Sequence, residues 1–394
     1  MYTLTNSTIK NKTIFLRVDY NLPLKNNIPQ DLTKIKSSLK TITHLLKHNN
    51  KIILATHLGR PDGKFHDEFS TSHLLKPLQS LVPKHKITHL ADCIGLDIKT
   101  IIQKSSSKIF LLENLRFYSE EEQDDQTFAQ SLASLADIYI NDAFAVSHRT
   151  NASVHAITKY LPSYAGFQLE TEIIQLSKAL HPQPPVIWIL GGAKLDKIDL
   201  IQQSLQKANY ILIGGALSFA FLKAKNISVG QSKTDTQSIQ IAKSILNSPH
   251  VNKIILPQDF ITTTKMSPNT KTSIRNYNEI HSTEIALDLG PKTIALFKHY
   301  LRKAHTIVWN GPLGYYEWSK FAQATKDIGR FISTLTAITI VGGGETADAM
   351  HKFHLHHKLT HISTGGGASL EFLSGKILPG ITALNENQKH FKPL

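Results

Sequence analysis

The stretch AITIVGGGETADAM, residues 337–350, joins a β-branched apolar run to three glycines and a following helical segment. The run shows no alternation of apolar and polar residues, which is typical of a parallel strand covered on both faces. Glycines between such a strand and a helix let backbone N–H groups approach phosphate oxygens, and the helix adds its positive end. The stretch predicts a strand–turn–helix unit with an anion site, although Glu345 places a carboxylate there.

Similar apolar runs recur along both halves of the chain. They lie at 12–19, 51–58, 108–115 and 136–143, and then at 185–192, 208–215, 251–259, 304–311, 337–344 and 360–367. Longer segments of helical period separate them. We predict the α/β class, with two doubly wound, Rossmann-like domains that are three-layer α/β/α sandwiches with mainly parallel sheets.

A helical segment followed by prolines divides the two halves. Apolar residues from Leu169 to Leu180 recur at helical spacing, and prolines follow at 182–185. We expect an N-terminal domain at 1–166, a C-terminal domain at 182–375, and an interdomain helix at 167–181. This helix is the candidate hinge across a cleft between the two domains.

Composition argues against several classes of protein. The chain has 394 residues, 41% of them apolar, which suffices for a core in each of two domains. It begins without the apolar stretch of a signal peptide, and no window approaches the roughly 18 apolar residues of a membrane span, so we expect a cytoplasmic protein. The single cysteine, Cys93, argues against a disulfide framework. The net charge of +14 comes largely from scattered lysines, which indicates compositional drift more than a patch.

Glycine-rich sequences follow five of the strands predicted in the second half. They are GGAK (191–194), GGA (214–216), NGPLG (310–314), GGGET (342–346) and TGGGAS (364–369). One such loop is weak evidence, because glycine after a strand often serves only a tight turn. Five at the carboxyl edge of one sheet predict a site for a nucleotide or another polyphosphate. The chain has no GxxxxGK[ST] loop and is therefore not a P-loop enzyme.

Charged and polar side chains follow the strands predicted in the first half. Three of the seven arginines lie at or just beyond these strand ends, beside a histidine and an Asp/Asn pair. A guanidinium fork suits bidentate capture of phosphate or carboxylate. Each arginine alone is more simply a surface ion pair, but their shared location predicts an anion-binding basin and therefore group transfer across a cleft. The residues are Asp19, Asn21, His57, Arg60, Arg116 and Arg149.

In this order and spacing, the stretches resemble phosphoglycerate kinase. The resemblance rests on RVDYN, HLGRP, LLENLRF, NDAF…HR, GGAK, WNGPLGYYE, GGGET and STGGGASLE, and it runs to LPGITAL near the end. It implies a glycolytic kinase that moves a phosphoryl group reversibly between 1,3-bisphosphoglycerate and ADP, giving 3-phosphoglycerate and ATP with Mg²⁺, by in-line transfer on domain closure. It also implies a monomer whose C-terminal tail, 376–394, packs on the N-terminal domain.

The resemblance assigns roles to the residues at matching positions. It implies that the glycerate substrate binds to Asp19, Tyr20, Asn21, Lys34, His57, Leu58, Gly59, Arg60, Arg116 and Arg149. It implies that the nucleotide binds to Gly191, Lys194, Lys197, Gly214, Gly215, Gly290, Asn310, Glu317, Gly343, Gly344, Glu345 and Thr346. The implied catalytic residues are Lys34, Lys194 and Lys197, because phosphoryl transfer needs positioning and charge neutralisation, not a nucleophilic side chain.

Glu345 is implied to meet Mg²⁺ on the nucleotide phosphates, which would explain a carboxylate at an anion site. The alternative is a helix-terminal acid favoured by the helix dipole. Glu345 stands where the family usually has aspartate, and Lys34 where it has a catalytic arginine. Lysine keeps the charge but loses the planar fork, so we expect weaker transition-state stabilisation. The stretch GGAKLDKI is also one residue shorter than usual.

Other functions stay open at this point. A catalytically impaired regulatory or binding relative of the same fold would account for the substitutions, but it would need fewer of the retained site residues. A nucleic-acid-binding protein would lose binding steeply with salt, and no recognised motif supports one. Five histidines in HKFHLHHKLTH (351–361) suggest a metal site, although a solvated helix end is the simpler interpretation.

Overall fold

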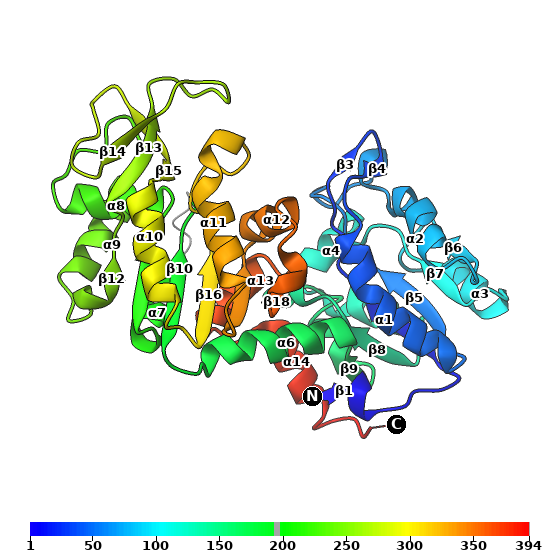
Figure 1. Ribbon diagram of the computed structural model, residues 1–394. Coiled ribbons are helices and arrows are strands. Elements are labelled where there is room, and N and C mark those ends of the chain that lie inside the picture. The colour runs from blue at the N-terminus through cyan, green and yellow to red at the C-terminus, as the bar shows by residue number, and fades with distance from the viewer. Residues whose placement is uncertain (193–197, 394) are drawn as a thin grey trace. The chain divides into compact units, whose positions relative to one another are not determined.

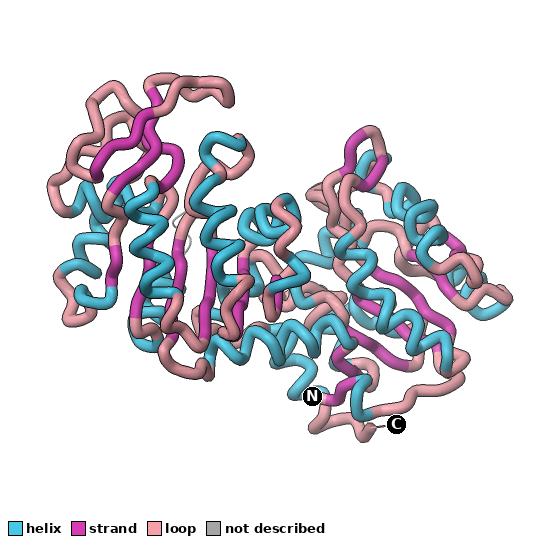
Figure 2. Tube along the Cα trace, in the orientation of Figure 1, coloured by secondary structure: helices cyan, strands magenta, loops and turns pink. Residues whose placement is uncertain are grey.

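Two mainly parallel sheets organise the chain (Figures 1 and 2). The computed structural model describes residues 1–192 and 198–393. The chain divides into two compact units: the first combines Met1–Ile174 with Ile377–Leu394, and the second is Gln175–Lys376. The boundary between them falls inside helix α6 (Phe167–Leu180). Among the described residues, no helix is both long and apolar enough to cross a membrane.

The first unit is built around a seven-stranded sheet. All of its neighbouring strands pair in parallel, in the order β1-β9-β8-β2-β5-β7-β6. The strands are β1 (Tyr2–Thr3), β2 (Thr13–Arg17), β5 (Lys51–Ala55), β6 (Ile87–His89), β7 (Ile109–Leu111), β8 (Ile138–Asn141) and β9 (Ser163–Ala165). The helices are α1 (Thr33–Lys47), α2 (Leu75–Leu81), α3 (Leu96–Lys104), α4 (Ser119–Glu122), α5 (Gln126–Ala133) and α14 (Pro379–Asn387). A small hairpin joins β3 (Leu24–Lys25) to β4 (Ile28–Pro29).

The second unit contains a six-stranded parallel sheet in the order β12-β11-β10-β16-β17-β18. Its strands are β10 (Val186–Leu190), β11 (Tyr210–Ile213), β12 (Ile254–Ile255), β16 (Thr306–Asn310), β17 (Ile338–Gly342) and β18 (His361–Ile362). A separate antiparallel sheet holds β13 (Asp259–Thr263), β14 (Ser273–Asn276) and β15 (Ile285–Leu289). The helices are α7 (Ile198–Lys207), α8 (Leu217–Ala224), α9 (Thr236–Leu246), α10 (Pro291–Leu301), α11 (Gln323–Ile332), α12 (Gly344–Lys352) and α13 (Gly367–Leu373).

The prediction of an α/β protein with two mainly parallel sheets is confirmed. Residues at the centre of each large sheet are buried on both faces, as with Phe15 and Leu16 of β2 and Ile187 and Trp188 of β10, all at most 1% exposed. This explains why their sequences do not alternate. One prediction was wrong in detail: the run 251–259 is not one strand. Pro257 lacks a backbone donor, and the chain leaves the parallel sheet after β12 and enters the antiparallel sheet at β13.

Register brings the strand ends of each sheet to one level. In the first sheet, the last residue of β2, Arg17, lies opposite Ala55 of β5 and Asn141 of β8. The loops that leave these three strands therefore start side by side at the carboxyl edge, where ligands bind in open parallel sheets.

The C-terminal segment of the first unit is tied down by a buried asparagine. Asn387, 3% exposed at the end of α14, accepts a hydrogen bond at Oδ1 from the Ser163 amide (2.9 Å). Its Nδ2 donates to the carbonyl oxygens of Leu161 (2.8 Å) and Thr158. One side chain thus satisfies three backbone groups beside β9.

We predict that Asn387→Ala destabilises the first unit by about 2–4 kcal/mol, because it leaves buried backbone groups without partners. Urea unfolding followed by circular dichroism measures the effect. Glu386→Ala, at an exposed neighbouring position of the same helix, is the matched control. Equal unfolding midpoints for the two variants would contradict the anchoring role.

Candidate active site

Lys34 lies in the first turn of α1 and is held against the loop that follows β2. Its Nζ donates to Asp19 Oδ2 at 2.6 Å and to the carbonyl oxygen of Asn21 at 3.1 Å. The Asn21 amide donates in turn to Asp19 Oδ1 (3.1 Å). The Lys34 side chain is 29% exposed, so the ammonium group is fixed in place and still open to a ligand.

His57 follows β5 and is neutral. It is buried, and burial together with the nearby charge of Arg17 holds its pKa well below 6.5. Its Nδ1 lies 3.2 Å from Arg17 Nη2. Because a guanidinium can only donate, Nδ1 accepts and Nε2 carries the proton. His57 can therefore donate a hydrogen bond to an anionic oxygen without holding a charge of its own.

Arg17 was missed by sequence reasoning as a site residue, although it opens the RVDYN stretch. It is 1% exposed, and its Nε donates to Ser153 Oγ at 2.8 Å. Ser153 donates from both its hydroxyl (2.6 Å) and its amide (2.9 Å) to the buried carboxylate of Glu121, which lies 3.8 Å from Arg17 Nη2. A buried charge needs such pairing, and this network fixes the group that orients His57.

Asn114 is a second residue that sequence reasoning missed. It is fully buried, and its Nδ2 donates to the carbonyl oxygens of Leu58 (2.7 Å) and Phe69 (2.9 Å). Its Oδ1 accepts from the amides of Leu58 (3.2 Å) and Arg116 (3.0 Å). The loops after β5 and β7 are thereby joined through one side chain.

Two of the predicted arginines converge on one carboxylate oxygen. Glu122 Oε1 lies 3.1 Å from Arg116 Nη2 and 4.0 Å from Arg149 Nη1. Arg116 Nη1 also donates to the carbonyl oxygen of Gly59 (2.8 Å). The two guanidinium groups are thus close enough for a single anionic oxygen to contact both. Arg60 is exposed on the neighbouring loop.

Three predicted substrate residues have side chains that are buried or absent and so cannot contact a ligand. Tyr20 is fully buried and its hydroxyl pairs with Ser38 Oγ (2.7 Å). Leu58 is 1% exposed. Gly59 adopts φ +64°, and a Cβ there would lie 2.3 Å from the Phe69 ring. Their part in the site is therefore to shape the backbone.

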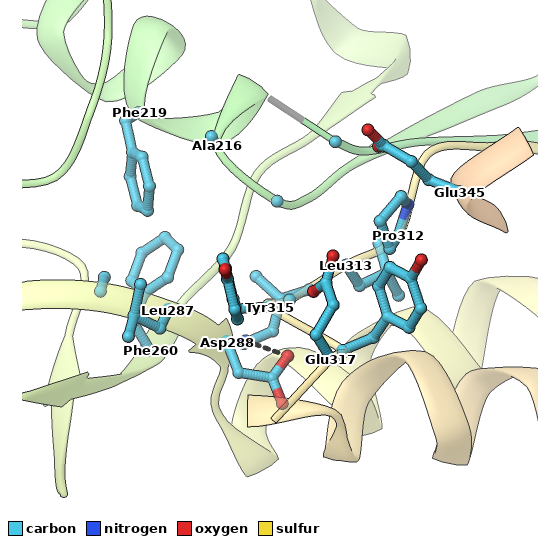
Figure 3. A pocket seen from close by; sticks show the side chains of 16 residues that line it. Ala216, Phe219, Phe260, Leu287, Asp288, Pro312, Leu313, Tyr315, Glu317 and Glu345 are labelled. Carbon is cyan, nitrogen blue, oxygen red and sulfur yellow. Dashed lines mark hydrogen bonds between the residues drawn. The ribbon is translucent and has the colours of Figure 1, made fainter. Parts of the chain in front are cut away.

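The second unit holds a pocket of about 230 Å³ beside the glycine-rich strand ends (Figure 3). One end is apolar, with Phe219 and Phe260 facing each other at a ring-centroid distance of 5.5 Å. The other end carries the carboxylates of Glu317 and Glu345. Of the predicted nucleotide residues, Gly215, Glu317 and Glu345 line this pocket. Sequence reasoning missed the aromatic pair, because nothing in the spacing of two phenylalanines 41 positions apart shows that they meet.

Close packing explains three of the predicted glycines, two of them against backbone and one against a side chain. A Cβ on Gly191 would lie 2.3 Å from the Pro312 carbonyl oxygen, and one on Gly214 would lie 2.4 Å from the Leu313 side chain. Gly215 has φ +55°, and a Cβ there would lie 2.6 Å from the Gly192 nitrogen. Larger residues would push these turns apart.

The stretch GGGET (342–346) forms the turn at the start of α12. Gly343 has φ +89° and precedes the helix, and a Cβ there would lie 3.0 Å from Asn310 Nδ2. That Nδ2 is buried and has no hydrogen-bond partner within the described ranges 1–192 and 198–393. The space around Gly344 is open. Thr346 has a structural task, since its Oγ1 accepts from the Gly311 amide at 2.7 Å.

Gly290 lies against a helix cap instead of the pocket. A Cβ on it would strike the Asp259 carboxylate at 2.3 Å, and that carboxylate accepts from the Lys292 and Thr293 amides at the start of α10. Lys194 and Lys197, the two predicted catalytic lysines of this half, lie outside the described residues.

Asp288 is a buried carboxyl group in the wall of the pocket. Burial raises its pKa to about 8. Its two oxygens accept from the amides of Leu289 (2.9 Å) and Ala324 (3.1 Å). A Cβ on Gly314 would lie 2.1 Å from Asp288 Oδ1, so this carboxyl group positions the loop that carries Tyr315 and Glu317.

Comparisons with known proteins give the family. A family model for phosphoglycerate kinase matches residues 4–376. The chain belongs to the phosphoglycerate kinase family. It is therefore an enzyme of a glycolytic kinase family that uses ATP and ADP. The phosphoglycerate kinase of Dictyoglomus turgidum is 42% identical over 389 residues, covering 97% of this chain and 98% of that protein. That of Finegoldia magna is 42% identical over 402 residues, covering 98% and 99%.

Two solved structures of phosphoglycerate kinases are similar to this chain over nearly its whole length. The structure from Coxiella burnetii has 33% sequence identity and a TM-score of 0.86, and covers 98% of both chains. The structure from Pyrococcus horikoshii has 29% identity and a TM-score of 0.88, covering 99% of this chain and all of that one. The prediction of the family from sequence is confirmed.

The raised pKa of Asp288 leads to a prediction about how the stability of the protein depends on pH. Its pKa is about 8 in the folded protein against an ordinary 3.8, so between these values the folded state holds a proton that the unfolded state has released. The free energy of unfolding must then fall as pH rises, and Asp288 alone lowers it by about 2 kcal/mol between pH 6 and 8. We predict that Asp288→Asn flattens this dependence.

The measurement is urea unfolding at pH 6, 7 and 8, followed by tryptophan fluorescence, since all three tryptophans lie in the second unit. The control is Asp235→Asn. Hydrogen bonds from Ser238 lower the pKa of Asp235, so this group does not titrate in the window. The slope is the readout, because the Asp288→Asn variant would lose one of the two amide contacts and with it some stability at every pH. Equal slopes in wild type and Asp288→Asn would overturn the assignment.

Proposed function

We propose that this chain transfers a phosphoryl group reversibly between 1,3-bisphosphoglycerate and ADP, giving 3-phosphoglycerate and ATP. The observation that carries the proposal is the convergence of Arg116 and Arg149 on one oxygen of Glu122. Guanidinium groups so placed suit a phosphate, which presents several oxygens to donors in a fork. With exposed Arg60 they make a basin for the phosphate of a phosphoglycerate.

The remaining groups of the first unit suit the other end of the same substrate. His57 presents a neutral Nε2–H donor for a carboxylate or acyl-phosphate oxygen. Asp19 and Asn21 supply acceptors and donors for the hydroxyl group. Lys34 adds the positive charge that a transferring phosphoryl group requires, because most of the barrier reduction in phosphoryl transfer comes from positioning and neutralisation.

The pocket of the second unit suits a nucleotide. The aromatic end, with Phe219 and Phe260, fits a planar base, and the Glu317 carboxylate can accept from sugar hydroxyls. We propose the turns at Gly214, Gly215, Gly343 and Gly344 for the phosphates. The amides of Gly214 and Gly215 already donate to the carbonyl oxygens of Leu190 and Leu313, so the backbone donors would come from the turn at Gly343 and Gly344, where α12 begins. We also propose Lys194 and Lys197 as cations for the transferring group, as the resemblance implies.

The donor set also fits Mg²⁺. Glu345 brings a carboxylate to the pocket beside the glycine turn, while among the described residues no cluster of three or more His, Cys, Asp or Glu side chains is placed to hold a metal ion. Mg²⁺ commonly takes one or two protein carboxylates and completes its shell with water and nucleotide phosphates. When bound, the ion would neutralise charge on those phosphates. Glu345 is the group of this chain that we propose for that shell, whereas the orphaned Asn310 Nδ2 is a donor and would bind a phosphate oxygen of the nucleotide.

Transfer requires the two bound ligands to meet. Reacting atoms must come within roughly 3–3.5 Å, and the two sets of residues belong to different units. We therefore propose that the domains 1–166, with the tail 376–394, and 182–375 close on each other, with residues 167–181 as the hinge. Closure would also exclude water as a competing acceptor. A monomer in the cytoplasm is the form we propose for this glycolytic enzyme.

The test is steady-state turnover with 3-phosphoglycerate and Mg-ATP, coupled to reduction of the acyl phosphate. We expect turnover in the range of roughly 1–10³ s⁻¹ common to enzymes. Lys34→Arg should raise kcat about three- to tenfold, because a planar fork can hold two phosphoryl oxygens where an ammonium is a point charge. Lys36→Arg, exposed on the same helix, is the matched control.

A kcat for Lys34→Arg that is unchanged or lower would contradict the role given to the fork. No turnover in either form, with both ligands still bound, would instead favour the catalytically impaired regulatory relative.

A further inference from the structure

We propose that Tyr315 is a further nucleotide-binding residue, and that its phenol hydroxyl hydrogen-bonds to the nucleoside half of ADP and ATP. This inference rests on the proposed function, because it takes the pocket of the second unit as the nucleotide site. Tyr315 lies in the loop after β16 and lines that pocket.

The position of Tyr315 in the pocket places it at the nucleoside. Figure 3 shows its side chain standing between the apolar end, with Phe260 and Leu287, and Glu317 on the other side. A base that packs at the aromatic end and a sugar that reaches Glu317 would both pass beside Tyr315. The turn at Gly343 and Gly344, which we propose for the phosphates, follows β17 instead.

The Tyr315 hydroxyl is free to take a ligand. Within residues 1–192 and 198–393 it makes no hydrogen bond, whereas the hydroxyl of the next residue, Tyr316, donates to Asp348 Oδ2 at 2.8 Å. A phenol is both donor and acceptor, and on a half-exposed residue such as Tyr315 it bonds to water until a ligand takes the place of that water. A nucleoside oxygen or ring nitrogen would be the replacing partner.

The ring is held so that the hydroxyl stays in place. The Tyr315 amide donates to the Leu287 carbonyl oxygen at 2.8 Å, which fixes the residue against β15. Its ring packs on Trp318 with centroids 4.6 Å apart and planes at 52°. A side chain restrained on both sides loses little freedom when it binds a ligand, so the hydroxyl contact adds to affinity at small entropic cost.

The test is isothermal titration calorimetry of wild type and Tyr315→Phe with ADP and with AMP. Phenylalanine keeps the ring on Trp318 and removes only the hydroxyl. We expect Kd to rise about three- to tenfold for both ligands, since one hydrogen bond is lost and both share the nucleoside. The KM for 3-phosphoglycerate and the unfolding midpoint should not change.

Tyr300→Phe is the matched control. Tyr300 lies on α10 of the same unit with its ring on Tyr210. Its hydroxyl likewise has no hydrogen bond in the described part of the chain, but it does not line the pocket. Tyr300→Phe should bind ADP as wild type does.

Three results would overturn the inference. An unchanged ADP affinity in Tyr315→Phe would show that the hydroxyl meets only solvent, and turnover of the wild type would leave the proposed function standing. A loss confined to ADP and absent with AMP would place the contact at the phosphates. A wild-type protein that binds no ADP would remove the nucleotide site and the proposed function together.

Discussion

Both halves of this protein depend on in-register parallel pairing. When both faces of a parallel sheet are covered, its strands are buried and polar side chains lie mainly at the strand ends. The register of the strands decides which residues lie side by side at those ends. Arg17 lies opposite Ala55 and Asn141 in one sheet, while Leu190 lies opposite Ile213 and Asn310 in the other. A slip of one residue would turn buried side chains to the opposite face and move every loop of the edge. The proposed anion basin and the proposed nucleotide pocket thus both follow from the same in-register pairing.

The carboxyl ends of the two sheets differ in the charged groups that they carry. In the first unit, cations are held by acceptors of the protein itself: Lys34 by Asp19, and Arg17 by Glu121 through the Ser153 network. His57 stays neutral among them, and can therefore donate without adding to the repulsion. In the second unit, basic side chains are sparse at the described strand ends, and the donors that we propose for an anion are backbone amides of the turn at the start of α12. Each edge is therefore suited to an anion of a different kind.

Much of this could be predicted from the sequence, because it depends on local patterns. Apolar runs without alternation predicted the parallel strands. The residues directly after these runs predicted His57, Arg116 and the turn at Gly343 as parts of the site. The supporting groups could not be found in this way. Arg17 meets Ser153 across 136 positions and Asn114 meets Leu58 across 56, so their roles exist only after folding. Tyr20 shows the converse, since a residue inside a recognised motif proved to belong to the core.

The antiparallel sheet of β13, β14 and β15 was also not predicted from sequence. It supplies Phe260 and Leu287 to the pocket wall, so the apolar end of the proposed nucleotide site depends on an element that lies apart from the main sheet. The apolar end of the pocket forms only when separate elements pack together, so the sequence does not predict it. The glycine turn proposed for the phosphates lies within one strand–turn–helix unit, so the local sequence predicts it.

Hydrogen exchange measured by mass spectrometry can show whether each sheet edge binds its own ligand. We expect 3-phosphoglycerate alone to slow amide exchange in peptides covering 57–60 and 114–117, and ADP alone to slow exchange in peptides covering 214–217 and 342–346. ADP that protects the first pair of segments and leaves the glycine turns unchanged would contradict this expectation.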